Sequence, residues 1–261
     1  MSVQKSWPEL QKMARACRIV VDTLDALEQA AAPGVTTKEL DRIARARIEG
    51  AGAKPAFLGY RGYPATLCVA VNEEIVHGIP SGRKLKAGDI VGLDLGCVVA
   101  GFYGDAARTV AVGEVSAEAR RLMATTQEAL QAGIRACQPG RRVGDIGNAV
   151  QTFAEGRGYS VVREFVGHGI GTKLHEEPQV PNYGPAGRRE RLVPGMCLAI
   201  EPMVNVGGPE VRMLDDGWTA VTADGSLSAH YEFTVAVTQH GPWILSEPYP
   251  FADREAEAAR A

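Results

Sequence analysis

The sequence predicts an α+β fold in which one antiparallel sheet is covered by helices, and two observations support this prediction. In each half of the chain, segments with helical character come first and segments with strand character follow. Elements grouped in this way favour an antiparallel sheet with its helices on one face. The second observation is that the two halves share a pattern of turns. The fold is therefore expected to be internally duplicated, with pseudo-twofold halves.

The duplication emerges when the chain is compared with itself at an offset of about 106 residues. Pro33-Gly34 then coincides with Pro139-Gly140, and each pair follows a segment with helical character. With one further residue of offset, the segment 85–94 matches the segment 192–201, which places the carboxylates that end them at equivalent positions. A period this long indicates two fused half-domains rather than a solenoid, and ligands from both halves would converge at their junction.

The helices of the first half begin at capping motifs. Ser6-Trp-Pro8-Glu9 is a capping box with a proline in the first helical turn, and it begins an amphipathic helix that runs to about Ala31. Thr36-Thr-Lys-Glu39 repeats the motif and begins a second helix that ends near Gly50. Short apolar or β-branched segments then predict strands over residues 66–71, 90–99 and 108–112.

The second half repeats this order of elements. Two helices are predicted over about residues 116–137 and 143–156, and strands over residues 197–200, 218–222 and 231–238. We expect a single domain over residues 1–261, with half-repeats at about 6–113 and 114–240 and a peripheral tail at 247–261.

Composition and charge limit the functional classes. With 261 residues and 45% apolar content, the chain can bury a substantial core. Its net charge is −3 and it has no basic block, so nucleic acid is not an expected substrate. No apolar segment approaches the roughly 20 residues that span a membrane, and the N-terminus lacks a signal-peptide core, so we expect a cytoplasmic protein. Five cysteines without a Cys-x-x-Cys motif argue against disulfides and a thiolate zinc site.

Four carboxylates lie inside apolar, strand-like segments. They are Asp94, Asp105, Glu201 and Glu232, and the histidine of a Gly-His-Gly motif, His168, accompanies them. Burying an unpaired carboxylate is costly, so such groups need a cation. No lysine or arginine stands beside these acids apart from Arg108. The sequence therefore predicts a metal centre with these five residues as ligands.

Each of these residues alone has a simpler explanation. Asp105 lies in a glycine-rich segment typical of turns, and Glu232 could face solvent from a strand. His168 could be an ordinary turn or core histidine. Asp94 and Glu201 could belong to buried ion pairs, but their equivalent positions in the repeat argue against this. The joint occurrence of all five in matched segments favours the metal centre.

Seven short segments occur in a distinctive order. They are Gly-Tyr60-Arg-Gly-Tyr63-Pro, Asn72-Glu-Glu-Ile-Val-His77-Gly-Ile-Pro80, Gly104-Asp105, Gly167-His168-Gly-Ile-Gly171, His175-Glu-Glu-Pro178, Glu201-Pro202 and Tyr231-Glu232. Together they resemble the type I methionine aminopeptidases over about residues 6–247. The resemblance implies the pita-bread fold, a duplicated α+β domain, and a chain that forms a single catalytic domain.

The resemblance also implies a centre of two divalent metal ions. Asp105 and Glu232 would bridge the ions. Asp94 would complete one site, and His168 with Glu201 would complete the other. Ligation by carboxylate oxygens and one imidazole suits Mn²⁺, Fe²⁺, Co²⁺ or Zn²⁺ and does not choose among them. Bound ions would lower the pKa of a coordinated water from about 15.7 toward 7 and so supply a nucleophile at neutral pH.

Catalytic and substrate-binding roles follow from the same resemblance. Glu201 would carry a proton from the attacking water to the departing amine. His175 would stabilise the developing oxyanion, and His77 would lie near the substrate nitrogen or the scissile amide, so both histidines would contact the substrate. The methionine pocket maps onto soft or apolar side chains that suit a thioether, namely Tyr60, Tyr63, Cys68, Trp218 and Leu174.

The leading functional prediction is a hydrolase, a dinuclear metallo-exopeptidase that removes the initiator methionine from nascent polypeptides and favours a small second residue. A monomer is expected, with a transient ribosome contact as its one further interaction and no membrane partner. Two alternatives remain. A prolidase or Pro-processing aminopeptidase would share the fold and the ligands, whereas a non-catalytic pita-bread binding protein would have lost them. All five ligands are present, which argues against the second alternative.

Three positions depart from the family pattern. Arg61 stands where many relatives carry histidine, Lys173-Leu174 replaces a common aromatic residue, and Phe233 follows Glu232 where histidine or asparagine is frequent. None of the three is a metal ligand, so the departures bear on the shape of the pocket more than on the chemistry. His230 and His240 match no required position and are expected to be structural.

Overall fold

A nine-stranded sheet forms the centre of the fold in a computed structural model, which describes residues 4–251. Its strands are β1 (Lys54–Pro55), β2 (Cys68–Val71), β4 (Ile90–Val99), β5 (Phe102–Ala111), β7 (Gly167–Gly169), β8 (Glu176–Val180), β9 (Cys197–Ile200), β14 (Glu232–Thr238) and β15 (Gly241–Ile244). They are hydrogen-bonded in the order β1-β4-β5-β14-β9-β7-β8, with β2 also paired to β4 and β15 to β14. All of these pairings are antiparallel, which confirms the predicted sheet.

Shorter elements surround the large sheet. One three-stranded sheet joins β6 (Ser160–Val161), β10 (Met203–Asn205) and β13 (Ser228–His230). Another joins β3 (Glu74–Val76), β11 (Val211–Met213) and β12 (Ala220–Thr222). A single 3₁₀ turn at Tyr60–Gly62 interrupts the connection between β1 and β2.

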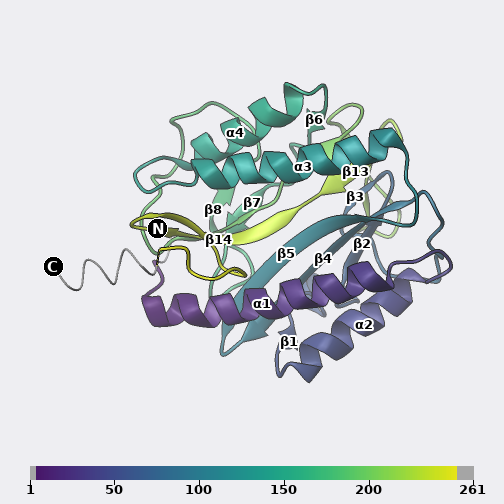
Figure 1. The fold of residues 1–261 in the computed structure, drawn as a ribbon, viewed down its shortest axis with the longest axis horizontal. Helices are drawn as coiled ribbons and strands as arrows, with labels where there is room; N and C mark the ends of the chain where they lie inside the picture. The colour runs from purple at the N-terminus through teal and green to yellow at the C-terminus, as the bar shows by residue number, and fades with distance from the viewer. Residues whose placement is uncertain (1–3, 252–261) are drawn as a thin grey trace.

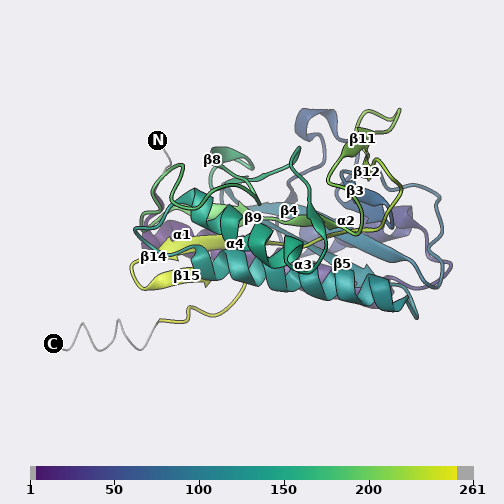
Figure 2. The ribbon, with the colours of Figure 1, turned by 90° about the horizontal axis from the view of Figure 1, so that it is seen from above.

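Among residues 4–251, four α-helices accompany the sheet. They are α1 (Trp7–Ala30), α2 (Thr37–Gly50), α3 (Ala117–Ala136) and α4 (Val143–Glu155). Helix α1 packs on β4 and β5, whereas α3 contacts β9 and packs on α4. In Figure 1, α1 and α3 run side by side across the sheet, with β5 and β14 visible between them. Figure 2 shows α3 on one side of the molecule and the β11–β12 hairpin on the other. None of the described helices is long and apolar enough to cross a membrane.

The strand order is similar when it is followed outward in either direction from the central β5–β14 pair. Strand β5 pairs with β4, which pairs with β2, and β14 pairs with β9, which pairs with β7. This symmetry supports a duplicated plan, while the boundaries of the half-repeats stay a prediction.

The predicted helices agree closely with α1 to α4, and the strands predicted at 90–99 and 197–200 coincide with β4 and β9. The prediction for β5 was too short, because the strand begins at Phe102 and not at residue 108. Its first half begins with the strand-favouring Phe102 and Tyr103, but Gly104 and Asp105, which are disfavoured in strands, interrupt the local signal. Pairing with β4 along all ten residues of β5 imposes the extended conformation.

The predicted peripheral tail is packed where it begins. The ring of Tyr249 lies 4.9 Å from that of Trp7 and 5.1 Å from that of Trp243, between centroids. The first residues of the tail therefore cover the start of α1. Residues 252–261 of the expected tail lie outside the described residues.

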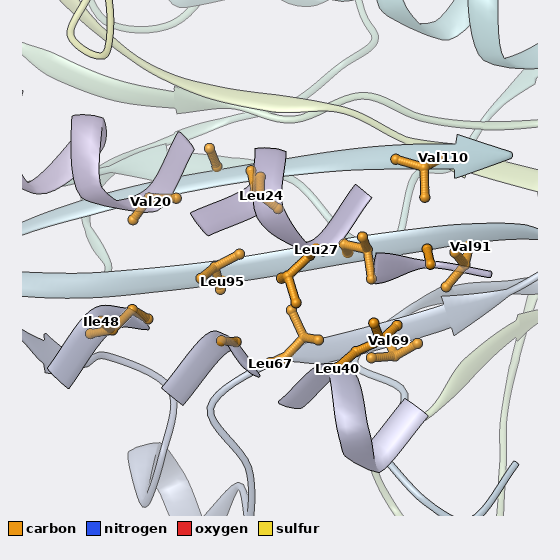
Figure 3. Close-up of a cluster of buried hydrophobic side chains, with 14 of the residues drawn as sticks. Val20, Leu24, Leu27, Leu40, Ile48, Leu67, Val69, Val91, Leu95 and Val110 are labelled. Carbon is orange, nitrogen blue, oxygen red and sulfur yellow. The ribbon is translucent and has the colours of Figure 1, made fainter. Parts of the chain in front are cut away.

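Apolar packing fixes α1 to one face of the sheet. Leu24 and Leu27 of α1 are buried in a cluster with Leu95 of β4 and Val110 of β5 (Figure 3). Burying a side chain of this kind contributes roughly 1.5–3 kcal/mol relative to leaving it exposed. Because helices occupy this face, any solvent-accessible chemistry of β4 and β5 has to use the opposite face.

We predict that Gly104→Ala destabilises the protein by about 1–3 kcal/mol, the usual cost of overpacking a core. A Cβ atom on Gly104 would lie 2.5 Å from the backbone nitrogen of Cys17 and 2.7 Å from the carbonyl carbon of Ala16. Both are backbone atoms of α1, so the helix would have to shift. Urea unfolding monitored by circular dichroism gives the change in the free energy of unfolding.

Gly50→Ala is the matched control for this substitution. Gly50 ends α2, and a Cβ atom there would meet nothing within 4 Å. Alanine is favoured over glycine in helices by up to about 1 kcal/mol, so the free energy of unfolding should stay constant or rise slightly. Equal destabilisation by the two substitutions would show that close packing of α1 on β5 is not the cause.

Candidate metal centre

The direction of Asp105 is set by the alternation of side chains along β5, since neighbours on a strand point to opposite faces of the sheet. Gly104 lies against α1, and Arg108 forms ion pairs of 2.7 Å with two carboxylates of that helix, Asp25 and Glu28. Asp105 is one residue from Gly104 and three from Arg108 on the same strand, so its side chain points away from the helices. The one cationic neighbour found in the sequence, Arg108, is therefore neutralised on the other face.

The strand register places two more carboxylates on the face of Asp105. Ala107 of β5 is the direct partner of Asp94 on β4 and of Glu232 on β14. Directly opposed residues share a face, and Ala107 lies two positions after Asp105 on the same strand. Three carboxylates therefore gather around a small alanine side chain, which occupies little of the space between them.

Strands β7 and β9 bring the histidine and the fourth carboxylate. His168 lies on β7, which pairs with β9, and Glu201 directly follows β9. His168 Nε2 lies 3.5 Å from Oε1 of Glu201. One donor atom from each of Asp105, His168 and Glu232 lies within 4.8 Å of the others, close enough to hold a metal ion. These three residues form the tight group, and Asp94 and Glu201 lie at its border.

Burial raises the pKa of all four carboxyl groups. Desolvation is the largest cause in each, and repulsion by neighbouring acids adds to the rise in pKa for Asp94, Glu201 and Glu232. Desolvation raises the pKa of Asp105 to about 7, although a hydrogen bond from the Ala106 backbone opposes the rise. Without a cation, this cluster therefore retains protons near neutral pH.

Unpartnered oxygens indicate that the acids lack a protein cation. Oδ1 of Asp94, Oδ1 of Asp105 and Oε1 of Glu232 are buried and accept no hydrogen bond. Within residues 4–251, no lysine or arginine forms an ion pair with any of the four acids. Carboxylates in this state are costly unless a cation satisfies them. The donor set of carboxylate oxygens with one imidazole fits a divalent transition metal.

A cavity of about 150 Å³ opens beside the carboxylates. All of the site residues named from the sequence line it, namely Tyr60, Tyr63, Cys68, His77, Asp94, Asp105, His168, Leu174, His175, Glu201, Trp218 and Glu232. The structure thus brings together residues that are far apart in the chain, from the 3₁₀ turn to β14.

Aromatic contacts hold the wall of this cavity. Tyr63 meets Trp218 edge to face, with ring centroids 5.1 Å apart, and donates a hydrogen bond of 2.8 Å to the carbonyl oxygen of Gly78. Tyr60 stacks on His175, and its hydroxyl group lies 2.9 Å from Nδ1 of that histidine. Because each polar tip has a partner, the rings are fixed in orientation and present their apolar surfaces to the cavity.

The histidines of the site are neutral at neutral pH. Burial lowers the pKa of His168 to about 3 and that of His77 to about 4, and repulsion by His175 lowers both further. The pKa of His175 is also lowered, first by burial and then by the charge of Arg61. Neutral imidazoles can ligate a metal or donate a hydrogen bond to a substrate.

Sequence reasoning did not assign three residues that the structure places at the site. Phe57 and Arg61 line the cavity, and Nε2 of His230 lies 3.8 Å from Oε2 of Glu201. His230 was expected to be structural, yet its buried Nε2 has no hydrogen-bond partner. The available signal was its position two residues before Glu232, since residues two apart in an extended chain point to the same side.

Comparison with known proteins gives a consistent result. The family model for metallopeptidase family M24 matches residues 11–239. A methionine aminopeptidase of Clostridium perfringens is 51% identical over 246 residues, which cover 94% of this chain and 99% of the relative. Methionine aminopeptidase 1 of Bacillus subtilis is 48% identical over 246 residues, with the same two coverages.

Solved structures show the same likeness. The crystal structure of a methionine aminopeptidase from Thermotoga maritima matches with a TM-score of 0.93 and 43% identity, over 95% of this chain and 100% of that one. A prolidase from Pyrococcus furiosus matches with a TM-score of 0.76 and 22% identity, over 95% of this chain and 66% of that one, which is a likeness of fold alone. These matches confirm the predicted pita-bread fold.

The metal-free protein should lose stability as the pH rises from 6.5, the usual pKa of histidine, through about 7, the raised pKa of Asp105. A carboxyl group with a raised pKa binds more protons in the folded state than in the unfolded chain, so a rising pH favours unfolding up to the folded pKa. Below pH 6.5 the buried histidines, whose pKa values are lowered, act in the opposite sense. Thermal unfolding of the chelator-treated protein across this window measures the effect.

Asp94→Asn is the control, because it removes one of the carboxyl groups whose pKa is raised. The decline of stability with rising pH should then be shallower. Saturating Mn²⁺ should abolish the decline, since metal ligands have to be deprotonated and binding favours the ionised cluster. A metal-free protein with constant or rising stability over the window would contradict the protonated cluster.

Proposed function

The chain belongs to metallopeptidase family M24, and we propose that it acts as a methionine aminopeptidase that removes the N-terminal methionine from nascent polypeptides. The observation that carries this proposal is the placement of the carboxylate and histidine cluster at the wall of a small cavity with aromatic sides. The near full-length likeness to methionine aminopeptidases supports it.

The cavity has the size and surface that one apolar side chain requires. Its volume of about 150 Å³ is below the roughly 300–1,000 Å³ of pockets for drug-sized ligands. Tyr63, Cys68, Leu174 and Trp218 are soft or apolar, and sulfur makes favourable contacts with aromatic rings. A methionine side chain suits this cavity, and the aromatic residues that line it would favour a small second residue.

Five residues would hold two divalent ions. Asp105 and Glu232 would bridge them, Asp94 would complete one site, and His168 with Glu201 would complete the other. When bound, the ions supply Lewis acidity that lowers the pKa of a coordinated water toward 7. Mn²⁺, Fe²⁺, Co²⁺ and Zn²⁺ all suit this donor set.

Three side chains would carry out proton transfer and charge stabilisation. Glu201 would accept a proton from the attacking water and pass it to the departing amine. His175 has Nδ1 beside the Tyr60 hydroxyl group, which leaves Nε2 for the developing oxyanion. His77 is neutral because burial lowers its pKa, so it would donate a hydrogen bond near the scissile amide without adding a positive charge to the site.

The cellular setting proposed here follows from the substrate. Nascent chains are made in the cytoplasm, and we place the protein there as a monomer with a transient contact with the ribosome. Neither nucleic acid nor membrane is part of the proposed activity. The whole chain, residues 1–261, would act as one catalytic domain built from half-repeats at about 6–113 and 114–240.

The first test is peptide cleavage by metal-stripped protein titrated separately with Mn²⁺, Fe²⁺, Co²⁺ and Zn²⁺. We expect metal-dependent release of methionine from Met-Gly-Met-Met and no cleavage of Ala-Pro peptides, as measured by liquid chromatography with mass detection. Cleavage before proline would favour a prolidase-like activity. Absence of turnover with all four metals would favour a binding protein.

Glu201→Gln should reduce kcat by about 10²–10⁴-fold, the usual contribution of a general acid–base group. The substitution keeps the size of the side chain but removes its ability to carry a proton. Metal content should be measured in the same samples, because Glu201 is also a proposed ligand. Glu114→Gln, at an exposed position after β5, is the control that should retain normal kcat. Retained turnover in Glu201→Gln with full metal content would refute the proton-transfer role.

A further inference from the structure

A second cavity adjoins the first and has no assigned role. Its volume is about 610 Å³, and it shares Arg61, His168 and His175 with the inner cavity. Since the inner cavity has room for little more than one side chain, the remainder of a bound polypeptide has to leave it. The shared residues make the outer cavity, here called the outer groove, the path that is continuous with the metal centre.

The unpaired charges of the outer groove are mainly positive. Arg61 and Lys173 line it, are exposed, and form no ion pair within residues 4–251. Glu176 is neutralised, because Lys5 forms a buried ion pair of 2.6 Å with it. Glu177 is the remaining unpaired carboxylate among the lining residues. Arg61 is the cation that the groove and the inner cavity share.

Local structure fixes Arg61 at this junction. Its φ of +50° lies in the left-handed region, within the tight 3₁₀ turn Tyr60–Gly62. Its guanidinium group lies 5.5 Å from the centre of the Tyr60 ring, and Tyr60 in turn contacts His175. A cation held in this way can act on the first residues of a substrate.

We propose that the outer groove binds the residues that follow the small second residue, and that Arg61 gives the enzyme a preference for an acidic side chain at the third residue. This proposal rests on the proposed function. In an extended peptide, the side chains of residues one and three point to the same side. Tyr60 and Tyr63 line the pocket for the first side chain, and Arg61, which lies between them in the sequence, lines both this pocket and the outer groove. The third side chain is therefore the one that meets Arg61.

The test compares three C-terminally amidated peptides, Met-Ala-Asp-Gly, Met-Ala-Asn-Gly and Met-Ala-Lys-Gly. Amidation removes the terminal carboxylate, so Asp and Asn differ only in the charge of interest. We expect kcat/KM for the Asp peptide to exceed that for the Asn peptide by about two- to fivefold at low ionic strength, the range for exposed ion pairs. The Lys peptide should be the poorest. The ratios should approach one at about 1 M salt, where the Debye length is about 3 Å.

Variants decide whether Arg61 is the cause of the preference. Arg61→Gln should bring the Asp-to-Asn ratio close to one, and Arg61→Glu should invert it. Arg42→Gln is the charge-matched control, because Arg42 is 73% exposed on α2 and does not line either cavity. It should preserve the wild-type ratio. A wild-type ratio of one, or a ratio that Arg61→Gln leaves unchanged, would overturn the proposal.

The Asn peptide separates this proposal from the proposed function. Release of methionine from Met-Ala-Asn-Gly with no charge preference would uphold the aminopeptidase and overturn the role of Arg61. If no peptide is cleaved with any metal, the proposed function fails. In that case, the affinities of the three peptides for wild-type and Arg61→Gln protein, measured by calorimetry, still decide whether the groove favours the acidic peptide.

Discussion

Four carboxylates meet in the interior of this protein, no cationic side chain of residues 4–251 pairs with them, and the rest of the structure is arranged around that cluster. The ion pairs of Arg108 lie on the other face of β5, and the nearby histidines are neutral because burial lowers their pKa values. Only protons or metal ions can then compensate the acids. Burial, and then repulsion by the neighbouring acids, raises the pKa of Glu232, and a bound divalent cation would offset both effects.

The division of the sheet into two faces follows from this requirement. Helix α1 approaches β5 so closely that Gly104 has no space for a Cβ atom, and the apolar residues of that face seal it. Asp105, one residue later, is thereby committed to the open face. Ala107 then serves as the centre of a row with Asp94 and Glu232 on either side. Close packing on one face and an open, polar site on the other are thus consequences of a single strand register.

Local signals in the sequence predicted much of this arrangement, and long-range pairing supplied the remainder. Capping boxes and glycines marked the helices, and β4 and β9 were found because they are apolar and β-branched. In the early part of β5, Gly104 and Asp105 interrupt the local strand signal, and pairing with β4 imposes the extended conformation. His230 was missed for a similar reason. It lies near Glu201 because β13 pairs with β10, where Met203 is the partner of His230, and this long-range pairing leaves no local pattern in the sequence.

The charge balance of the centre also determines which side chains set the electrostatic potential in the outer groove. With the two divalent ions that we propose, the four carboxylates would be close to neutral, so a loaded centre would contribute little net field to the outer groove. Arg61 and Lys173 then dominate the potential there, because Lys5 already neutralises Glu176. In the metal-free protein the ionised fraction of the acids would oppose these cations. The charge selectivity that we propose for the groove would therefore be a property of the metal-loaded protein, although neither Arg61 nor Lys173 is a proposed metal ligand.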